Sequence, residues 1–152
     1  MAGGQTKARI RIADAAGVSS PVIIGTPGND IIGPGPFNGV SLGGNDTIRA
    51  LQGNDTVNGF TGNDTIEGGE GEDTLIGAEH SDKVDGGNGK DTIDLAQFDT
   101  AGSHDEGLGG NGNDTVKAKD GNHDVIDCGN GKDTVFYDQG IDSITKCEVL
   151  NS

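Results

Sequence analysis

The sequence has no tryptophan, four phenylalanines and one tyrosine, and only 30% of its 152 residues are hydrophobic. This composition supplies little apolar surface for an ordinary packed core. No apolar run approaches the roughly 18 residues of a membrane-spanning helix, and residues 1–20 lack the apolar stretch of a secretory signal. We therefore expect no membrane span, and we expect something other than hydrophobic burial to stabilise the fold.

Positive charge is also scarce, because 10 basic residues stand against 25 acidic ones and the net charge is −15. The imbalance lies in residues 41–152, which carry seven basic and 23 acidic side chains. A strongly acidic surface repels phosphate backbones and attracts cations. The charge therefore argues against a nucleic-acid partner and favours cationic ones.

What the chain has in abundance is glycine, with 29 residues, and a pattern that recurs every nine residues. Eight blocks share it: Ser41–Arg49, Ala50–Asn58, Gly59–Glu67, Gly68–Ile76, Gly77–Asp85, Gly86–Asp94, Gly109–Lys117 and Cys128–Phe136. Position six is always aspartate: Asp46, Asp55, Asp64, Asp73, Asp82, Asp91, Asp114 and Asp133. Position four is glycine except at His80: Gly44, Gly53, Gly62, Gly71, Gly89, Gly112 and Gly131. Position eight is always aliphatic, which marks a stacked repeat architecture.

Weaker copies extend the array on both sides. Asp30 lies in one such copy, Gly25–Gly33, and Asp124 lies in another that follows one inserted residue. Asp105 and Asp142 fall nine residues before Asp114 and after Asp133, so they mark two degenerate blocks. We read residues 95–99 as a five-residue insertion and residues 34–40 as a loop. The regular spacing of aspartates breaks between Asp91 and Asp114, which predicts an interruption in the stack of coils.

Three segments follow from this layout. Residues 25–145 are expected to form the repeat domain, with an insertion near 95–108. Residues 146–152 are expected to form a C-terminal cap. In residues 1–24, the alternation over Ala8–Ala13 fits either a strand that covers the first coil or a flexible tail.

The spacing of nine predicts metal sites. Glycine-rich turns followed by three strand-forming residues close a flattened coil of about 18 residues, and parallel coils stack about 4.8 Å apart. Asp46 then lies beside Asp64, and Asp55 beside Asp73. Carboxylates at this distance repel by roughly 1 kcal/mol per pair in water and by more in a protein. A hard cation with six to eight oxygen ligands reverses this repulsion, so Ca²⁺ fits better than Mg²⁺ or Zn²⁺.

Blocks such as Gly86–Asp94 and Gly109–Lys117 closely resemble the RTX family, the haemolysin-type calcium-binding repeats. The resemblance covers about residues 25–145. It implies an all-β fold, a right-handed parallel β-roll (β-solenoid) with two repeats per coil, and a secreted protein that folds in a calcium-rich medium. In that family the position-six aspartates and turn carbonyls ligate calcium. This role carries over to the eight aspartates and seven position-four glycines above, to Asp30 and Asp124, and to the degenerate positions Asp105 and Asp142.

The chain departs from the family pattern at several positions. His80 replaces the position-four glycine, which puts the site around Asp82 in doubt. Position two carries Leu42, Leu51 and Phe60 in place of glycine.

The only two cysteines, Cys128 and Cys147, fit either one disulfide or two thiols by count. The tail that contains them resembles the ending of some stand-alone bacterial members of the family. One coil of 18 residues places Cys147 about one coil spacing from Cys128, within the Cα range of a disulfide. We therefore favour a disulfide that caps the end of the roll.

No catalytic constellation is visible in the sequence. The triad residue types at Ser103–Asp105 are sequence neighbours, which rarely converge in space. We therefore predict a non-enzymatic, extracellular, monomeric calcium-binding β-roll, free-standing or part of a larger secreted protein. The alternative is a surface-recognition module for ice, polysaccharide or a cell envelope. It would present the position-seven threonines as ladders: Thr47, Thr56, Thr65, Thr74, Thr92, Thr115 and Thr134.

Overall fold

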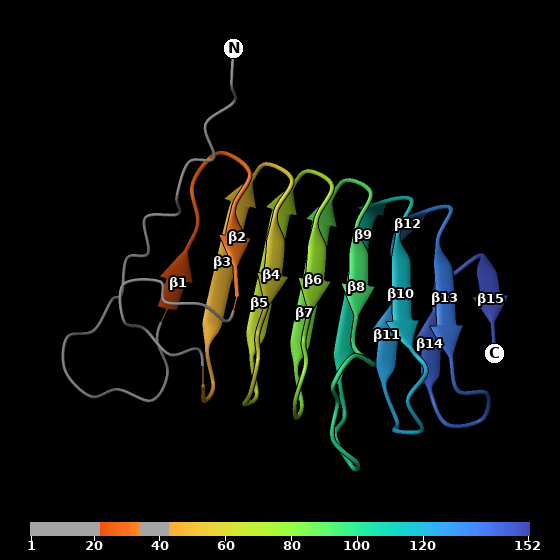
Figure 1. Cartoon of the computed structure of the whole chain (residues 1–152). Coiled ribbons are helices and arrows are strands. Elements are labelled where there is room, and N and C mark those ends of the chain that lie inside the picture. Colours follow the sequence, from red (N-terminus) through yellow and green to blue (C-terminus); the bar gives the residue numbers. More distant parts are fainter. Residues whose placement is uncertain (1–21, 34–42) are drawn as a thin grey trace.

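The computed structural model describes residues 22–33 and 43–152, and these contain only strands and turns (Figure 1). The chain alternates between two parallel sheets as it winds from one end of the molecule to the other. The first sheet contains β1 (Val22–Ile24), β3 (Thr47–Gln52), β5 (Thr65–Glu70), β7 (Lys83–Asn88), β9 (Glu106–Gly112), β11 (Val125–Asp127) and β14 (Ser143–Thr145), with β12 (Asn130–Gly131) beside β9. The second contains β2 (Ile31–Ile32), β4 (Thr56–Asn58), β6 (Thr74–Ile76), β8 (Thr92–Asp94), β10 (Thr115–Ala118), β13 (Thr134–Tyr137) and β15 (Val149–Asn151).

The strand register fixes the length of one coil. Ile48 lies opposite Ile66 in the first sheet, and Val57 lies opposite Leu75 in the second, so equivalent residues are 18 apart. Each coil therefore contains two blocks of nine, one strand in each sheet. The predicted all-β solenoid with two repeats per coil is confirmed.

The core is a thin layer between the two sheets. Side chains alternate along each strand, so the position-eight aliphatics point inward while positions seven and nine face outward. Ile48, Ile66, Leu75 and Ile93 are fully buried, and most strands contribute one such side chain. The inner layer consists of Ile23, Ile32, Ile48, Val57, Ile66, Leu75, Val84, Ile93, Val116, Ile126 and Val135, together with Ala50, Leu95, Ala118 and Cys128.

The expected interruption of the stack is wrong. β7 pairs with β9 along its length, with Lys83 opposite Glu106, and β8 pairs with β10, with Thr92 opposite Thr115. Both registers are 23 residues, which is one coil plus the five residues of the insertion. The insertion leaves the roll as a loop below β8 (Figure 1), so the sheets run on without a break.

At the N-terminal end, β1 extends the first sheet by pairing with β3, with Val22 opposite Thr47. The strand or tail expected over Ala8–Ala13 and the loop expected over residues 34–40 lie outside the described residues.

At the C-terminal end, β15 pairs with β13, and the predicted disulfide joins Cys128 to Cys147 with their Cα atoms 5.2 Å apart. Among the described residues, no helix has the length and apolar character needed to cross a membrane.

Candidate metal sites along the two edges of the roll

The position-six aspartates occupy the turns that join the two sheets, each directly before a strand. Eleven of them are at most 3% exposed: Asp30, Asp46, Asp55, Asp64, Asp73, Asp82, Asp91, Asp105, Asp114, Asp124 and Asp133. Ionised carboxylates are rarely buried without a compensating charge. Their shared burial therefore makes both edges of the roll candidate sites for cations.

Hydrogen bonds align these aspartates in two rows. The first row contains Asp46, Asp64, Asp82, Asp105, Asp124 and Asp142, and the second contains Asp30, Asp55, Asp73, Asp91, Asp114 and Asp133. Within each row, the backbone N–H of one aspartate donates to Oδ1 of the aspartate one coil further on. The N–H of Asp64, for example, lies 2.7 Å from Oδ1 of Asp82, and the N–H of Asp73 lies 2.8 Å from Oδ1 of Asp91.

The second carboxylate oxygen has no such partner. Oδ2 is buried without a hydrogen bond in ten aspartates of the two rows: Asp46, Asp55, Asp64, Asp73, Asp82, Asp91, Asp105, Asp114, Asp124 and Asp133. An orphaned buried acceptor of this kind costs about 1–3 kcal/mol, and more when it is charged. The repeated free oxygen is the feature that a row of bound cations would satisfy, so the residues present fit Ca²⁺.

Burial changes the acidity of these groups. Desolvation is the largest cause at every one, and it raises the pKa of Asp73 and of eight further aspartates in the rows. The raised pKa values are about 6 for Asp46, Asp55 and Asp114, about 7 for Asp64, Asp82, Asp91 and Asp124, and about 8 for Asp105. The rows therefore hold carboxylates that keep their protons to a higher pH than ordinary aspartates.

Glycine at position one of several blocks lets the carboxylate pack closely against the backbone. A Cβ built on Gly68 would lie 2.6 Å from Oδ2 of Asp73, and one built on Gly77 would lie 2.6 Å from Oδ2 of Asp82. The equivalent Cβ on Gly59 would collide with Oδ2 of Asp64. The absence of a side chain at Gly59, Gly68 and Gly77 therefore lets these carboxylates lie directly against the backbone.

Position four requires the left-handed backbone conformation. The seven predicted glycines have φ between 109° and 149°. In most of them an added Cβ would collide with the position-four carbonyl of the preceding coil, as Gly71 would with Gly53. These glycines therefore stack in the turns beside the aspartates, and their role as carbonyl ligands stays a prediction.

His80 takes the same conformation with φ of 82°, and Asp82 keeps its place in the first row. Its carboxylate accepts from the N–H of Asp64, and its own N–H donates to Oδ1 of Asp105 at 2.7 Å. His80 therefore does not displace Asp82 from the first row.

Sequence reasoning missed three acidic groups beside the rows. Glu148 ends the second row, because its Oε2 accepts the N–H of Asp133 at 2.9 Å. It lies 15 residues from Asp133, so the spacing of nine does not reveal it. Asp99 and Asp120 approach Asp105 from two loops outside the repeat pattern.

The triad residue types do not assemble. The Ser103 hydroxyl contacts Asp99 and the carbonyl of Thr100, while the His104 ring packs edge-on against His123 with centroids 5.7 Å apart. Asp105 points into the first row.

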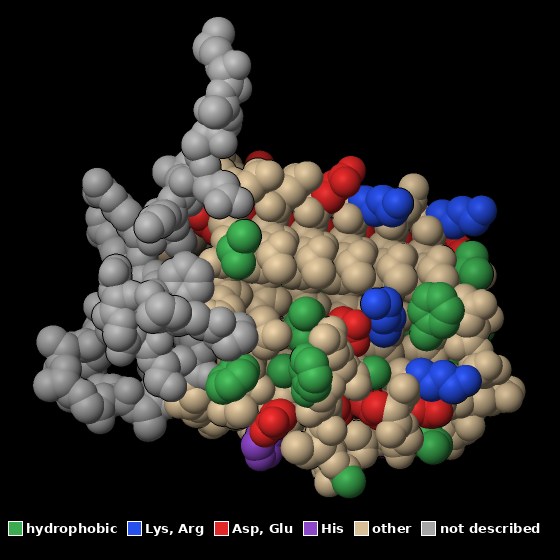
Figure 2. All heavy atoms as spheres, in the orientation of Figure 1, with side chains coloured by type: hydrophobic (Ala, Val, Ile, Leu, Met, Phe, Trp, Pro, Cys, Tyr) green, Lys and Arg blue, Asp and Glu red, His purple; other side chains and the backbone are tan. Residues whose placement is uncertain are grey.

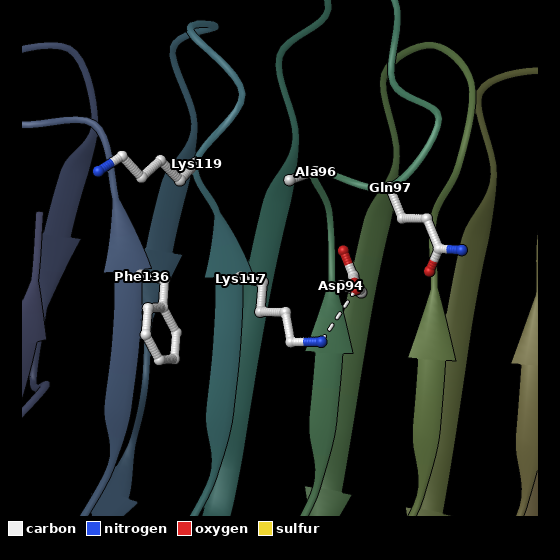
Figure 3. A pocket seen from close by; sticks show the side chains of 6 residues that line it. All are labelled: Asp94, Ala96, Gln97, Lys117, Lys119 and Phe136. Carbon is white, nitrogen blue, oxygen red and sulfur yellow. Dashed lines mark hydrogen bonds and ion pairs between the residues drawn. The ribbon is translucent and has the colours of Figure 1, made fainter.

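A shallow hollow of about 440 Å³ opens on the second sheet, away from the rows (Figure 3). It is lined by Asp94, Ala96, Gln97, Lys117, Lys119 and Phe136. Lys117 Nζ pairs with Asp94 across it at 3.2 Å. This lining contains charged and apolar groups but no pairing of a nucleophile with a base.

Comparison with known families decides the assignment. The family model for the RTX calcium-binding nonapeptide repeat (4 copies) matches residues 41–75, 58–93 and 108–144, more than half of the chain. The chain belongs to the RTX calcium-binding repeat family. Neither the curated proteins nor the solved structures gave a match.

The RTX repeats are in general calcium-binding and non-enzymatic, and they are typical of secreted proteins. The matched RTX segments stop at residue 93 and resume at residue 108. The insertion with Asp99 and Asp105 therefore lies between them.

Proposed function

We propose that this chain is an extracellular, non-catalytic calcium-binding β-roll that folds when it binds calcium, either alone or as the repeat domain of a larger secreted protein. The observation that carries the proposal is the pair of aspartate rows, in which ten buried carboxylates each retain an oxygen without a partner. The position-six aspartates would hold the ions, and the carbonyls of the glycine turns would complete the oxygen shell.

Folding on binding follows from the same rows. Neighbouring carboxylates in each row repel one another, and their burial opposes ionisation. Few apolar side chains are available to offset both costs, because the core is a single layer of mostly aliphatic side chains between the two sheets. Binding free energy would then act as folding free energy.

An extracellular setting is supported by two features. The Cys128–Cys147 disulfide belongs to oxidising compartments such as the outside of the cell. Weak extracellular sites need calcium at about 10⁻⁴ to 10⁻³ M, and calcium reaches this concentration only outside the cytosol. A chain that folds on calcium would therefore stay unfolded before export and fold afterwards.

Circular dichroism in chelator and then in millimolar calcium tests this proposal. We expect a spectrum of an unfolded chain in chelator and a strand-rich spectrum after calcium is added. An identical strand-rich spectrum under both conditions would refute folding on binding.

A matched pair of variants tests the rows themselves. Asp73→Asn keeps the oxygen that accepts the N–H of Asp55 but removes one charge from the middle of the second row. We expect a rise of at least tenfold in the calcium concentration at the folding midpoint. Glu67→Gln removes a charge from a half-exposed surface pair with Arg49, so we expect a change of less than twofold. Equal midpoints for the two variants would count against the rows as calcium sites.

One observation favours a second candidate, a surface-recognition module. Thr56, Thr74, Thr92, Thr115 and Thr134 are consecutive register partners, so they form one outward ladder on the second sheet. The neighbouring outward positions on this sheet carry charges of both signs, because Lys117 lies opposite Asp94 there. Figure 2 shows that a basic and an acidic side chain meet near the middle of this face.

Ice recrystallisation assays with calcium present separate the two candidates. A recognition module would inhibit ice growth, and Thr92→Lys would abolish the inhibition without unfolding the roll. No inhibition by the wild type would remove the ice-binding form of this candidate.

A further inference from the structure

The insertion brings together three carboxylates that the repeat does not align. Asp99 belongs to the inserted residues after β8, Asp105 belongs to the first row, and Asp120 lies in the loop between β10 and β11. One carboxylate oxygen from each lies within 4.8 Å of the other two. Three acidic side chains so close together repel one another strongly unless a cation lies among them.

Two of these carboxylates have an oxygen free for a ligand. Asp105 is 2% exposed, and its Oδ1 accepts the N–H of Asp82 while its Oδ2 has no partner. Oδ1 of Asp120 accepts the N–H of Asn122 at 2.7 Å, and its buried Oδ2 also lacks a partner. A carboxylate oxygen that is buried and receives no hydrogen bond needs another partner, and a bound cation would supply it.

Hydrogen bonds hold the third carboxylate in place. Oδ1 of Asp99 accepts the N–H of Thr100 at 2.6 Å, and its Oδ2 accepts from the Ser103 hydroxyl and from Nδ2 of Asn122 at 2.9 Å. Oδ1 of Asn122 in turn accepts the N–H of Gly102 at 2.8 Å. Asn122 therefore ties the insertion to the loop that carries Asp120.

These donors are all neutral. None of the four ion pairs between described residues includes Asp99, Asp105 or Asp120. The cluster is thus preorganised but not neutralised by the described part of the chain.

We propose that Asp99, Asp105 and Asp120 form a separate site for a hard divalent cation, and that Ca²⁺ is its ligand. In the regular rows the aspartates follow one another one coil apart, whereas here one carboxylate oxygen from each of three side chains converges on the same place. A higher ligand charge raises the affinity for calcium, so this site binds more tightly than the row sites. The bound ion fastens the inserted loop to the edge of the roll.

Counting bound ions on the full chain tests the site. Native mass spectrometry after calcium titration would compare the wild type with the double variant Asp99→Asn/Asp120→Asn, which leaves the first row intact. We expect the double variant to hold one calcium ion fewer at saturation and to lose the tightest binding step. The control is Asp94→Asn/Asp127→Asn, which removes the same charge from two surface pairs with lysines, and its ion count should equal that of the wild type.

An unchanged ion count and unchanged affinities in Asp99→Asn/Asp120→Asn would overturn the site while leaving the proposed calcium-dependent roll intact. A wild type that bound no calcium would overturn both. If the double variant does not fold, anomalous diffraction from wild-type crystals soaked in Tb³⁺ decides the question. A peak within coordination distance of all three carboxylates supports the site, and peaks along the rows without one here contradict it.

Discussion

Leu95 occupies the core space that Gly107 leaves empty. Gly107 is the position-eight residue of its block, where the regular blocks have an aliphatic side chain. A Cβ built on Gly107 would lie 3.0 Å from Cδ1 of Leu95, whose side chain is fully buried. Leu95, from the insertion, therefore supplies the buried apolar side chain that Gly107 lacks. The core between the two sheets is thus filled at this coil.

Leu95→Ala should accordingly destabilise the calcium-bound roll by about 2–4 kcal/mol, because it creates a cavity between the sheets. Urea unfolding in saturating calcium measures this loss. Phe98→Ala lies in the same insertion but removes a side chain that is 64% exposed, so it should change stability by less than about 0.5 kcal/mol. Similar losses in the two variants would show that Leu95 is not part of the core.

His80→Gly should stabilise the roll. A non-glycine residue in the left-handed region costs about 1–2 kcal/mol, and the greater freedom of glycine in the unfolded chain offsets part of this gain. His80 has φ of 82° and an exposed side chain, so we expect a net gain of about 0.5–1 kcal/mol in urea unfolding. His104→Gly makes the same exchange at an exposed residue outside this region and should lower stability instead. A loss of stability in His80→Gly would contradict the strain argument.

Reduction of the Cys128–Cys147 disulfide should destabilise the roll by about 3 kcal/mol, because it releases a loop of 19 residues in the unfolded chain. The effect should concentrate at the C-terminal end, where β15 pairs only with β13. Hydrogen exchange with and without reductant measures it, and β15 should lose protection before β8. In Cys128→Ala/Cys147→Ala the reductant should have no effect, which separates the disulfide from other actions of the reagent.

The periodic part of this molecule could be predicted from its sequence, whereas the non-periodic part could not. The spacing of nine placed Asp30 and Asp124 correctly in the rows, even though their blocks are imperfect. It failed at the insertion, because counting residues cannot show that five extra residues leave the sheets as a loop. It also missed Asp99, Asp120 and Glu148, whose positions depend on how loops fold back onto the roll.

The pH dependence of folding should reverse when calcium is added. Burial raises the pKa of the row aspartates from 3.8 to about 6 for Asp55, about 7 for Asp64 and about 8 for Asp105. The folded chain therefore holds more protons than the unfolded one between about pH 4 and pH 8. Without metal, this contribution to stability is fully present below about pH 4 and is lost as the pH rises through about 6 to 8.

Calcium imposes the opposite trend, because it binds only deprotonated carboxylates and releases their protons. In chelator, circular dichroism should show more strand at pH 4.5 than at pH 7.5. In a calcium titration, affinity should rise at least tenfold between pH 5 and pH 7.5, and calorimetry in buffers of different ionisation enthalpy should detect released protons. Glu67→Gln, which alters a half-exposed carboxylate, should follow the wild-type profile. A calcium affinity independent of pH over this range would show that the row aspartates are already ionised before the metal binds.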